Sequence, residues 1–216
     1  MSKNNVSEFF DYYAHDFNAI YGNENTFMHA LINRYFRKSM KLRYTKSIEG
    51  CYPIGGKSVI DIGCGPGHYA TALAKRGARY VCGIDFAEGM IDLARQNAKQ
   101  LGLDSKCEFV FGDFMTYSIR EKFDYSVVMG FMDYIKEPGR IIERVLSITK
   151  SKAFFSFPAD GGILAWQRKL RYKRRCDLFM YSNEELRGLF ANMNYKSIES
   201  EKIGRDFFIT VFMESQ

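Results

Sequence analysis

The sequence predicts an α/β protein with a doubly wound, mostly parallel sheet of seven strands, of which the last is antiparallel, preceded by a helical N-terminal extension. The first observation is that strand-like and helix-like segments alternate from residue 57 onward. Such alternation favours parallel strands joined by right-handed crossovers, with helices on both faces. The second is a glycine-rich turn directly after the first strand. The third is a short link between the last two strand-like segments, which allows a hairpin and no crossover.

Composition is that of a globular protein large enough for one domain with a full core. The chain has 216 residues, of which 46% are hydrophobic and 26% charged. No apolar run approaches the roughly 18 residues of a membrane span, and the N-terminus has no signal-peptide core. Five scattered cysteines without a CxxC pair argue against a disulfide scaffold or a zinc site and indicate the cytoplasm. The net charge of +6 permits an anionic partner.

The extension is predicted to cover residues 1–56, and the domain that carries the sheet residues 57–216. Two stretches of the extension, 7–21 and 26–47, combine helical apolar spacing with many aromatic residues. We expect this segment to act as a lid over the ligand edge of the sheet. Completion of the core is the alternative.

Strands are predicted where β-branched and aromatic residues cluster between turn residues. They cover 57–63, 80–86, 107–114, 123–130, 152–159, 195–203 and 206–214. Helices are predicted between them, over 68–77, 87–102, 139–148 and 182–193. Gly77 and Gly102 are the expected C-caps of the first two helices, and Ser182 is the expected N-cap of the last.

The glycine-rich turn, residues 61–67, reads DIGCGPG. Ligands of open α/β sheets bind at the carboxyl ends of strands, so this loop is the expected site. A dinucleotide fingerprint, G-x-G-x-x-G, would place its third glycine at position 68, which is His68. A carboxylate at Asp61 would also repel a pyrophosphate and attract an ammonium group. Spacing and charge therefore disfavour a dinucleotide.

The next two strands also end in acids. Asp85 follows the second strand, where a carboxylate can accept both hydroxyls of a ribose. Asp113 follows the third and can accept a hydrogen bond from an exocyclic amine. Phe114 can border a purine with its ring or its backbone, and Phe86 and Met90 can supply apolar walls. An ammonium group, a ribose and an adenine without phosphate describe S-adenosylmethionine.

Four segments, VIDIGCGPG, GIDFAEGMIDLA, FVFGDF and FDYSVVMGFMDYI, together resemble the motifs of the class I S-adenosylmethionine-dependent methyltransferases, which have a Rossmann-like fold. The resemblance covers residues 57–160 and, by topology, the C-terminal hairpin. It implies S-adenosylmethionine as the cofactor and S-adenosylhomocysteine as its product. The expected cofactor contacts are Asp61, Gly63, Cys64, Gly65, Gly67, Tyr69, Asp85, Phe86, Met90, Asp113, Phe114, Met129, Gly130, Tyr13 and Tyr21.

Some of these residues have a purely structural alternative. Gly67 can serve close packing of the following helix, and Asp61 can brace the loop. Met90 can belong to the core. Cys64 is expected to be a small backbone filler without thiol chemistry.

Catalytic residues are not evident, which suits a reaction accelerated mainly by alignment. His15, Asp133 and Tyr134 are the candidates for a direct role, and loop bracing is the alternative for the last two. The fourth strand is followed by neither a Pro-Pro-Tyr/Phe tetrad nor a Pro-Cys pair. Methylation of nucleobase or glutamine amines, or of a pyrimidine ring, is therefore disfavoured, and no metal is expected.

A basic cluster lies at 168–175, where six of eight residues are Lys or Arg. Helical spacing puts Arg168, Arg171 and Arg175 on one face, and arginines can bind a carboxylate or phosphate bidentately. We expect them to bind an anionic acceptor; a solvated helix face, a membrane surface or RNA is the alternative. A fainter resemblance to porphyrin-carboxylate methyltransferases, in DFNAIYG and FSFPADGGILAW, is compatible with an acidic group on a bulky acceptor.

The sequence thus predicts methyl transfer from S-adenosylmethionine to a small-molecule or lipid-linked, anionic acceptor, with oxygen favoured over nitrogen as the methylated atom. An RNA methyltransferase and a scaffold protein that binds the cofactor without turnover are the alternatives. Peripheral membrane contact is a secondary expectation, and nucleic acid is not favoured as a partner.

Overall fold

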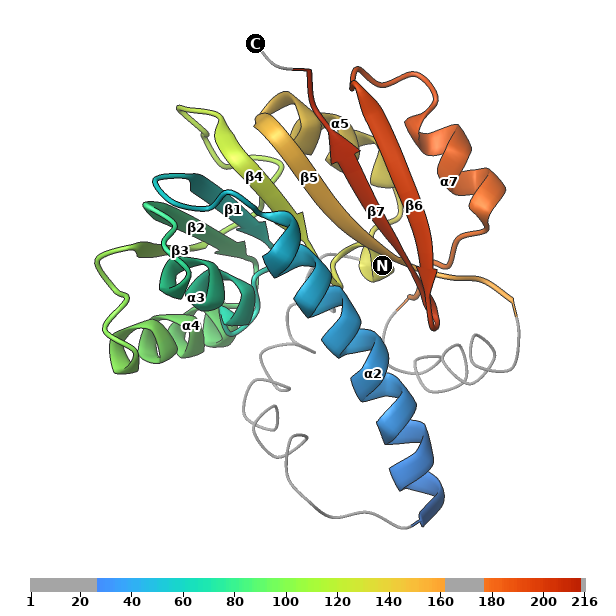
Figure 1. Ribbon diagram of the computed structural model, residues 1–216, viewed down its shortest axis with the longest axis horizontal. Coiled ribbons are helices and arrows are strands. Elements are labelled where there is room, and N and C mark those ends of the chain that lie inside the picture. Colours follow the sequence, from blue (N-terminus) through green and yellow to red (C-terminus); the bar gives the residue numbers. More distant parts are fainter. Residues whose placement is uncertain (1–26, 162–176, 215–216) are drawn as a thin grey trace.

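The computed structural model describes the backbone of residues 27–161 and 177–214, with side chains from residue 39 onward. Its centre is a sheet with helices on both faces (Figure 1). The strands are β1 (Ser58–Ile62), β2 (Tyr80–Asp85), β3 (Cys107–Phe111), β4 (Phe123–Val128), β5 (Thr149–Pro158), β6 (Ser197–Ile203) and β7 (Asp206–Phe212). The helices are α2 (Phe27–Gly50), α3 (His68–Lys75), α4 (Glu88–Gln100), the short 3-10 helix η1 (Met132–Tyr134), α5 (Pro138–Ser147) and α7 (Asn183–Phe190).

The strand order is β3-β2-β1-β4-β5-β7-β6. The first five strands in this order pair in parallel, and β7 is antiparallel to both β5 and β6. This confirms the predicted fold class, including the antiparallel last strand. Chain order reverses between β1 and β4, which are neighbours, so the topological switch point lies at their carboxyl ends.

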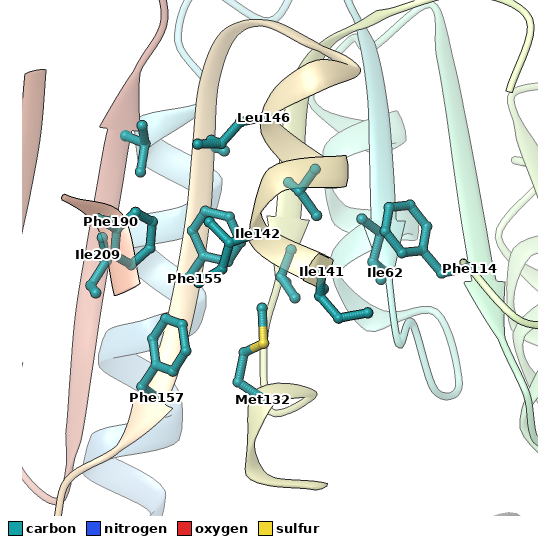
Figure 2. Close-up of a cluster of buried hydrophobic side chains, with 14 of the residues drawn as sticks. Ile62, Phe114, Met132, Ile141, Ile142, Leu146, Phe155, Phe157, Phe190 and Ile209 are labelled. Atoms are coloured by element: carbon teal, nitrogen blue, oxygen red, sulfur yellow. The ribbon is translucent and has the colours of Figure 1, made fainter. Parts of the chain in front are cut away.

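Alternating side chains of the strands feed two cores, one on each face of the sheet. Ile60 and Ile62 of β1 pack toward α5 and α7, whereas Val59 packs toward α2, α3 and α4. Figure 2 shows the first of these cores, in which large apolar side chains of the sheet, η1, α5 and α7 are in contact. The residues labelled there are Ile62, Phe114, Met132, Ile141, Ile142, Leu146, Phe155, Phe157, Phe190 and Ile209.

The helix ends follow the signals in the sequence. Gly77 and Gly102 adopt positive φ directly after α3 and α4, as expected for C-caps. Ser182 forms a capping box with Glu185 at the start of α7. Many strand limits differ from expectation by one or two residues, and the limits of two strands differ by three. β3 ends at Phe111 because the Asp113 side chain accepts from Met115 N and bends the chain, and β5 begins at Thr149, three residues early.

The long helix α2 crosses the face of the sheet that also carries α3, and its N-terminal half extends beyond the sheet (Figure 1). Ile48, near its C-terminal end, is 4% exposed and belongs to the core of that face. Lys46 forms an ion pair with Glu201 of β6 at 2.7 Å. The helix therefore completes the core and reaches from α3 to the C-terminal hairpin. No helix among the described residues is both long and apolar enough to cross a membrane.

Candidate functional site at the carboxyl edge of the sheet

The predicted ligand residues meet at one edge because β3, β2, β1 and β4 are adjacent and parallel. Their carboxyl ends bring the glycine loop after β1 beside Asp85, Asp113 and Gly130. The sequence-predicted residues of four separate segments are thus brought together.

The loop after β1 is fastened to the end of β2. The backbone N–H groups of Gly63 and Cys64 both donate to the carbonyl oxygen of Ile84, at 2.8 and 3.2 Å. Gly63, Gly65 and Gly67 all have positive φ, at 69°, 50° and 77°. Residues other than glycine rarely adopt this backbone conformation, so the fold of the loop itself requires glycine at these positions.

The three glycines differ in what surrounds them. A Cβ on Gly63 would stand 2.6 Å from the Phe131 ring, and one on Gly67 would stand 2.9 Å from the Phe109 ring. Protein atoms therefore occupy both positions, and the packing alternative for Gly67 is sufficient to explain it. A Cβ on Gly65 would meet no atom of the described residues within 4 Å. Gly65 is consequently the loop glycine that leaves open space for a ligand.

Asp85 joins the two loops that flank it. Its Oδ2 accepts from Gly65 N at 2.9 Å and its Oδ1 from Ala87 N at 3.0 Å. The side chain is 9% exposed. A carboxylate at the end of this strand can also accept hydrogen bonds from the hydroxyl groups of a ribose. The predicted role of Asp85 at the ribose is compatible with this geometry. Its hydrogen bonds also brace the loops that follow β1 and β2.

Asp61 lies behind the glycine loop and is 1% exposed. Burial raises the pKa of its carboxyl group from 3.8 to about 7, the Ala70 backbone N–H opposes this, and the charge of Asp85 adds to it. Its Oδ2 is buried without a hydrogen-bond partner among the described residues. A positive charge nearby would favour the ionised form.

Of the residues predicted for the adenine side, some are half-buried and others are fully buried. Asp113 and Phe86 are half-buried at the edge. Met90 is 2% exposed and packs with Ala87, which is the arrangement expected if it belongs to the core. The ring of Phe114 is 3% exposed, lies beside Ile62 in the core of Figure 2, and is covered by Arg144 at 5.2 Å. The expectation that this ring borders a purine is therefore corrected, and only its backbone remains available.

The segment after β4 closes the other side of the loop. Met129 is 8% exposed, and Gly130 is half-buried and donates its N–H to Ser156 Oγ at 2.8 Å. Asp133 is 4% exposed, and its carbonyl oxygen accepts from Phe179 N at 2.9 Å, which supports its bracing alternative. Tyr134 is half-buried in η1.

Tyr69 and Cys64 complete the predicted residues of the loop. Tyr69 is half-buried, and its ring contacts that of Tyr44 of α2, with centroids 5.3 Å apart. Cys64 is 5% exposed, and burial with nearby Asp61 raises the pKa of its thiol well above the usual value. The thiol is therefore uncharged, in agreement with its expected role as a filler.

Arg43 is a site residue that the sequence did not single out. Its side chain, from α2, is 11% exposed, and Nη1 donates to Ser156 Oγ at 3.3 Å. Nη1 also lies 4.0 Å from where a Cβ on Gly130 would stand. Its Nε is buried without a hydrogen-bond partner among the described residues. A cationic side chain thus reaches the carboxyl ends of β4 and β5 with part of its donor set unused.

Several predictions fall on residues outside the described ranges. They concern His15, Tyr13 and Tyr21 in the extension, and Arg168, Arg171 and Arg175 in the basic cluster. Within the described ranges, no group of three or more His, Cys, Asp or Glu side chains is placed to hold a metal ion.

An open α/β sheet with a glycine loop and acids at its switch point defines a ligand-binding protein of the doubly wound class. The chain belongs to the methyltransferase-domain family, whose profile matches residues 55–170.

Among curated proteins, the chain is 35% identical over 115 residues to a ubiquinone biosynthesis O-methyltransferase of Coxiella burnetii, a match that covers 51% of this chain and 47% of that protein. The chain thus spans about half the length of the curated relatives it matches. Among solved structures, a magnesium protoporphyrin IX methyltransferase from Synechocystis PCC 6803 with bound SAH is similar, with a TM-score of 0.76 at 19% identity over 99% of this chain and 100% of that one. The [4+2]-cyclase SpnF is also similar, with a TM-score of 0.67 at 14% identity over 98% and 96% of the two chains. The shared fold therefore serves more than one reaction.

Proposed function

We propose that this protein transfers a methyl group from S-adenosylmethionine to an oxygen of a small, acidic organic molecule. The observation that carries the proposal is the open Gly65 beside Asp85, with the buried, unpartnered Oδ2 of Asp61 behind the loop. These residues fit an adenosine derivative that carries positive charge and no phosphate. Membership of the methyltransferase-domain family and the O-methyltransferase among its relatives support the reaction.

The described residues divide the binding of such a cofactor among them. Asp85 holds the ribose hydroxyls, and the charge of Asp61 favours the ammonium and sulfonium groups. Asp113 and the backbone of Phe114 border the adenine. Arg43 supplies the counter-charge for the carboxylate of the methionine part, because its guanidinium group reaches the same edge, with Nη1 4.0 Å from where a Cβ on Gly130 would stand.

The chemistry supplied by bound S-adenosylmethionine is an electrophilic methyl group on a sulfonium. The protein contributes alignment and exclusion of water, and alignment alone is worth about 7–11 kcal/mol of barrier. A carboxylate acceptor is already ionised at neutral pH, so no side chain needs to remove a proton from it. This agrees with a site in which Asp133 braces a loop and no catalytic base is evident from the sequence.

The acceptor is proposed to be bound by the extension and by the basic cluster at 168–175, with residues 1–56 as a lid. The basic residues of α2 favour a lipid-linked acceptor at a membrane surface. These residues are Arg34, Arg37, Lys38, Lys41, Arg43 and Lys46. A cytoplasmic location is proposed as well, supported by the four free thiols of Cys51, Cys64, Cys82 and Cys107.

The test is to incubate the full chain and S-adenosylmethionine carrying a labelled methyl group with a cell extract. The extract is then separated into acidic small molecules, lipids, RNA and protein. We expect label in the acidic small-molecule or lipid fraction, released as methanol by mild alkali, as for a methyl ester. Label confined to RNA or protein would contradict the proposed acceptor. Release of no label by alkali would contradict esterification.

A further inference from the structure

The turn between β6 and β7 lies at the carboxyl edge of the sheet because β7 is antiparallel to β5. Asp206, the first residue of β7, pairs with Pro158, the last residue of β5, and is 1% exposed. Its neighbour in the turn, Arg205, accepts at its carbonyl from Ala159 N at 2.9 Å. A residue far from the glycine loop in sequence is thus buried beside the proposed site.

Asp206 binds α2 at two points. Its Oδ2 lies 3.6 Å from Arg43 Nη1 and 3.0 Å from Ser39 Oγ. The Ser39 hydroxyl also lies 3.2 Å from the carbonyl oxygen of Ile203, so its one proton is shared by two acceptors. Ser39 and Arg43 are one helical turn apart and therefore face the hairpin together.

These contacts hold only one corner of the guanidinium group. Nη1 contacts both Asp206 and Ser156 Oγ, and Ser156 in turn accepts from Gly130 N. The buried Nε has no hydrogen-bond partner among the described residues. The contacts with Asp206 and Ser156 thus hold Nη1 4.0 Å from where a Cβ on Gly130 would stand, at the edge where a guanidinium group can bind a carboxylate.

We propose that Asp206 is a positioning residue for the cofactor carboxylate, because together with Ser156 it fixes the guanidinium group of Arg43 beside Gly130. The proposal rests on the proposed function. An arginine side chain has many rotamers, and holding it before the ligand arrives lowers the entropic cost of binding. Contacts between the C-terminal hairpin and helix α2 would therefore influence the affinity for the cofactor.

The test compares two ligands that differ in one group, S-adenosylmethionine and decarboxylated S-adenosylmethionine, by calorimetry on the full chain. Asp206→Asn keeps the size and the Ser39 contact but removes the charge that holds Arg43. We expect its Kd for S-adenosylmethionine to rise about 3–10-fold, the cost of ordering one long side chain. Its Kd for the decarboxylated ligand should stay within about twofold of wild type, because that ligand does not use Arg43.

The matched control is Glu201→Gln. It removes the exposed ion pair with Lys46, which also joins α2 to the hairpin but lies away from the cofactor edge. We expect both Kd values to stay at wild type. If Asp206→Asn does not fold, Ser156→Ala, which removes the second partner of Nη1, is expected to give the same preference between the two ligands.

Equal weakening of both ligands, in whichever of these two variants folds, would show a merely structural role and overturn the inference, as would no change for either. Arg43→Met separates this result from a failure of the proposed function. If wild type binds S-adenosylmethionine and Arg43→Met weakens only the ligand with the carboxylate, the cofactor site stands even when Asp206→Asn has no effect. If wild type binds neither ligand, the proposed function fails, and this inference fails with it.

Discussion

Asp85 and Gly65 are joined by a hydrogen bond of 2.9 Å from the glycine N–H to the Asp85 carboxylate. The bond ties the end of β2 to the loop that follows β1. Because the same carboxylate also accepts from Ala87 N, it fixes the two loops relative to each other before any ligand arrives. A site assembled in advance in this way loses less entropy on binding.

Replacing Asp85 by Asn should weaken cofactor binding strongly. The change keeps the shape but exchanges a charged acceptor for a neutral one, at a cost of about 1.5–3 kcal/mol. We expect the Kd of S-adenosylhomocysteine, measured by calorimetry, to rise about 10–100-fold. Asp124→Asn is the control, since Asp124 accepts from Ser58 N at 2.8 Å at the opposite edge of the sheet. An equal loss of affinity in the control would argue against a specific role for Asp85.

Gly65→Ala should weaken cofactor binding, because the added methyl group would occupy the space proposed for the ligand. Gly56→Ala is the matched comparison. Both glycines have positive φ, 50° for Gly65 and 73° for Gly56, and in the described part of the chain neither would place a Cβ within 4 Å of another atom. Each variant should therefore lose about 1–2 kcal/mol of stability from backbone strain. Only Gly65→Ala should raise the Kd of S-adenosylhomocysteine, by about tenfold or more. Unchanged affinity in Gly65→Ala would mean that no ligand approaches the loop there.

Asp61 should make the stability of the protein depend on pH. Burial raises the pKa of its carboxyl from 3.8 to about 7, so the folded chain holds a proton that the unfolded chain has lost between these values. Stability therefore falls as pH rises through this window. Asp61→Asn imitates the protonated acid and should stabilise the protein at pH 8 by roughly 2–4 kcal/mol, with little effect near pH 4. Urea unfolding at both pH values measures this, and the same difference at each pH would contradict it.

Cofactor affinity should rise with pH over the same range if Asp61 favours a cation. The ammonium group of the ligand binds better to the ionised carboxylate, so binding releases a proton. Between pH 6 and 7.5 we expect the affinity for S-adenosylhomocysteine to increase about 5–10-fold in wild type and to stay flat in Asp61→Asn. Calorimetry in buffers of different ionisation enthalpy measures the number of protons released when the ligand binds. A parallel rise in the variant would assign the effect to another group.

Much of the fold, and the gathering of the candidate residues at one edge of the sheet, could be predicted because local chemistry determines them. The alternation of strands and helices predicted the mostly parallel sheet, and the short last link predicted the antiparallel last strand. Gly65 and Asp85 stand out because a ligand loop needs glycine and acids at fixed spacing. Arg43 could not be singled out, because it is one of many basic residues on α2 and only the tertiary contact with Ser156 distinguishes it. For Phe114 the sequence left the ring and the backbone as alternatives, and it could not show that the ring lies in the core, because that depends on packing and not on the motif.

The measurement that tests the central claim most directly is calorimetric titration of the full chain with S-adenosylhomocysteine, and separately with NAD. The account predicts saturable binding of S-adenosylhomocysteine with one site per chain and no measurable binding of NAD. Absence of S-adenosylhomocysteine binding, or tighter binding of the pyrophosphate-containing NAD, would contradict it.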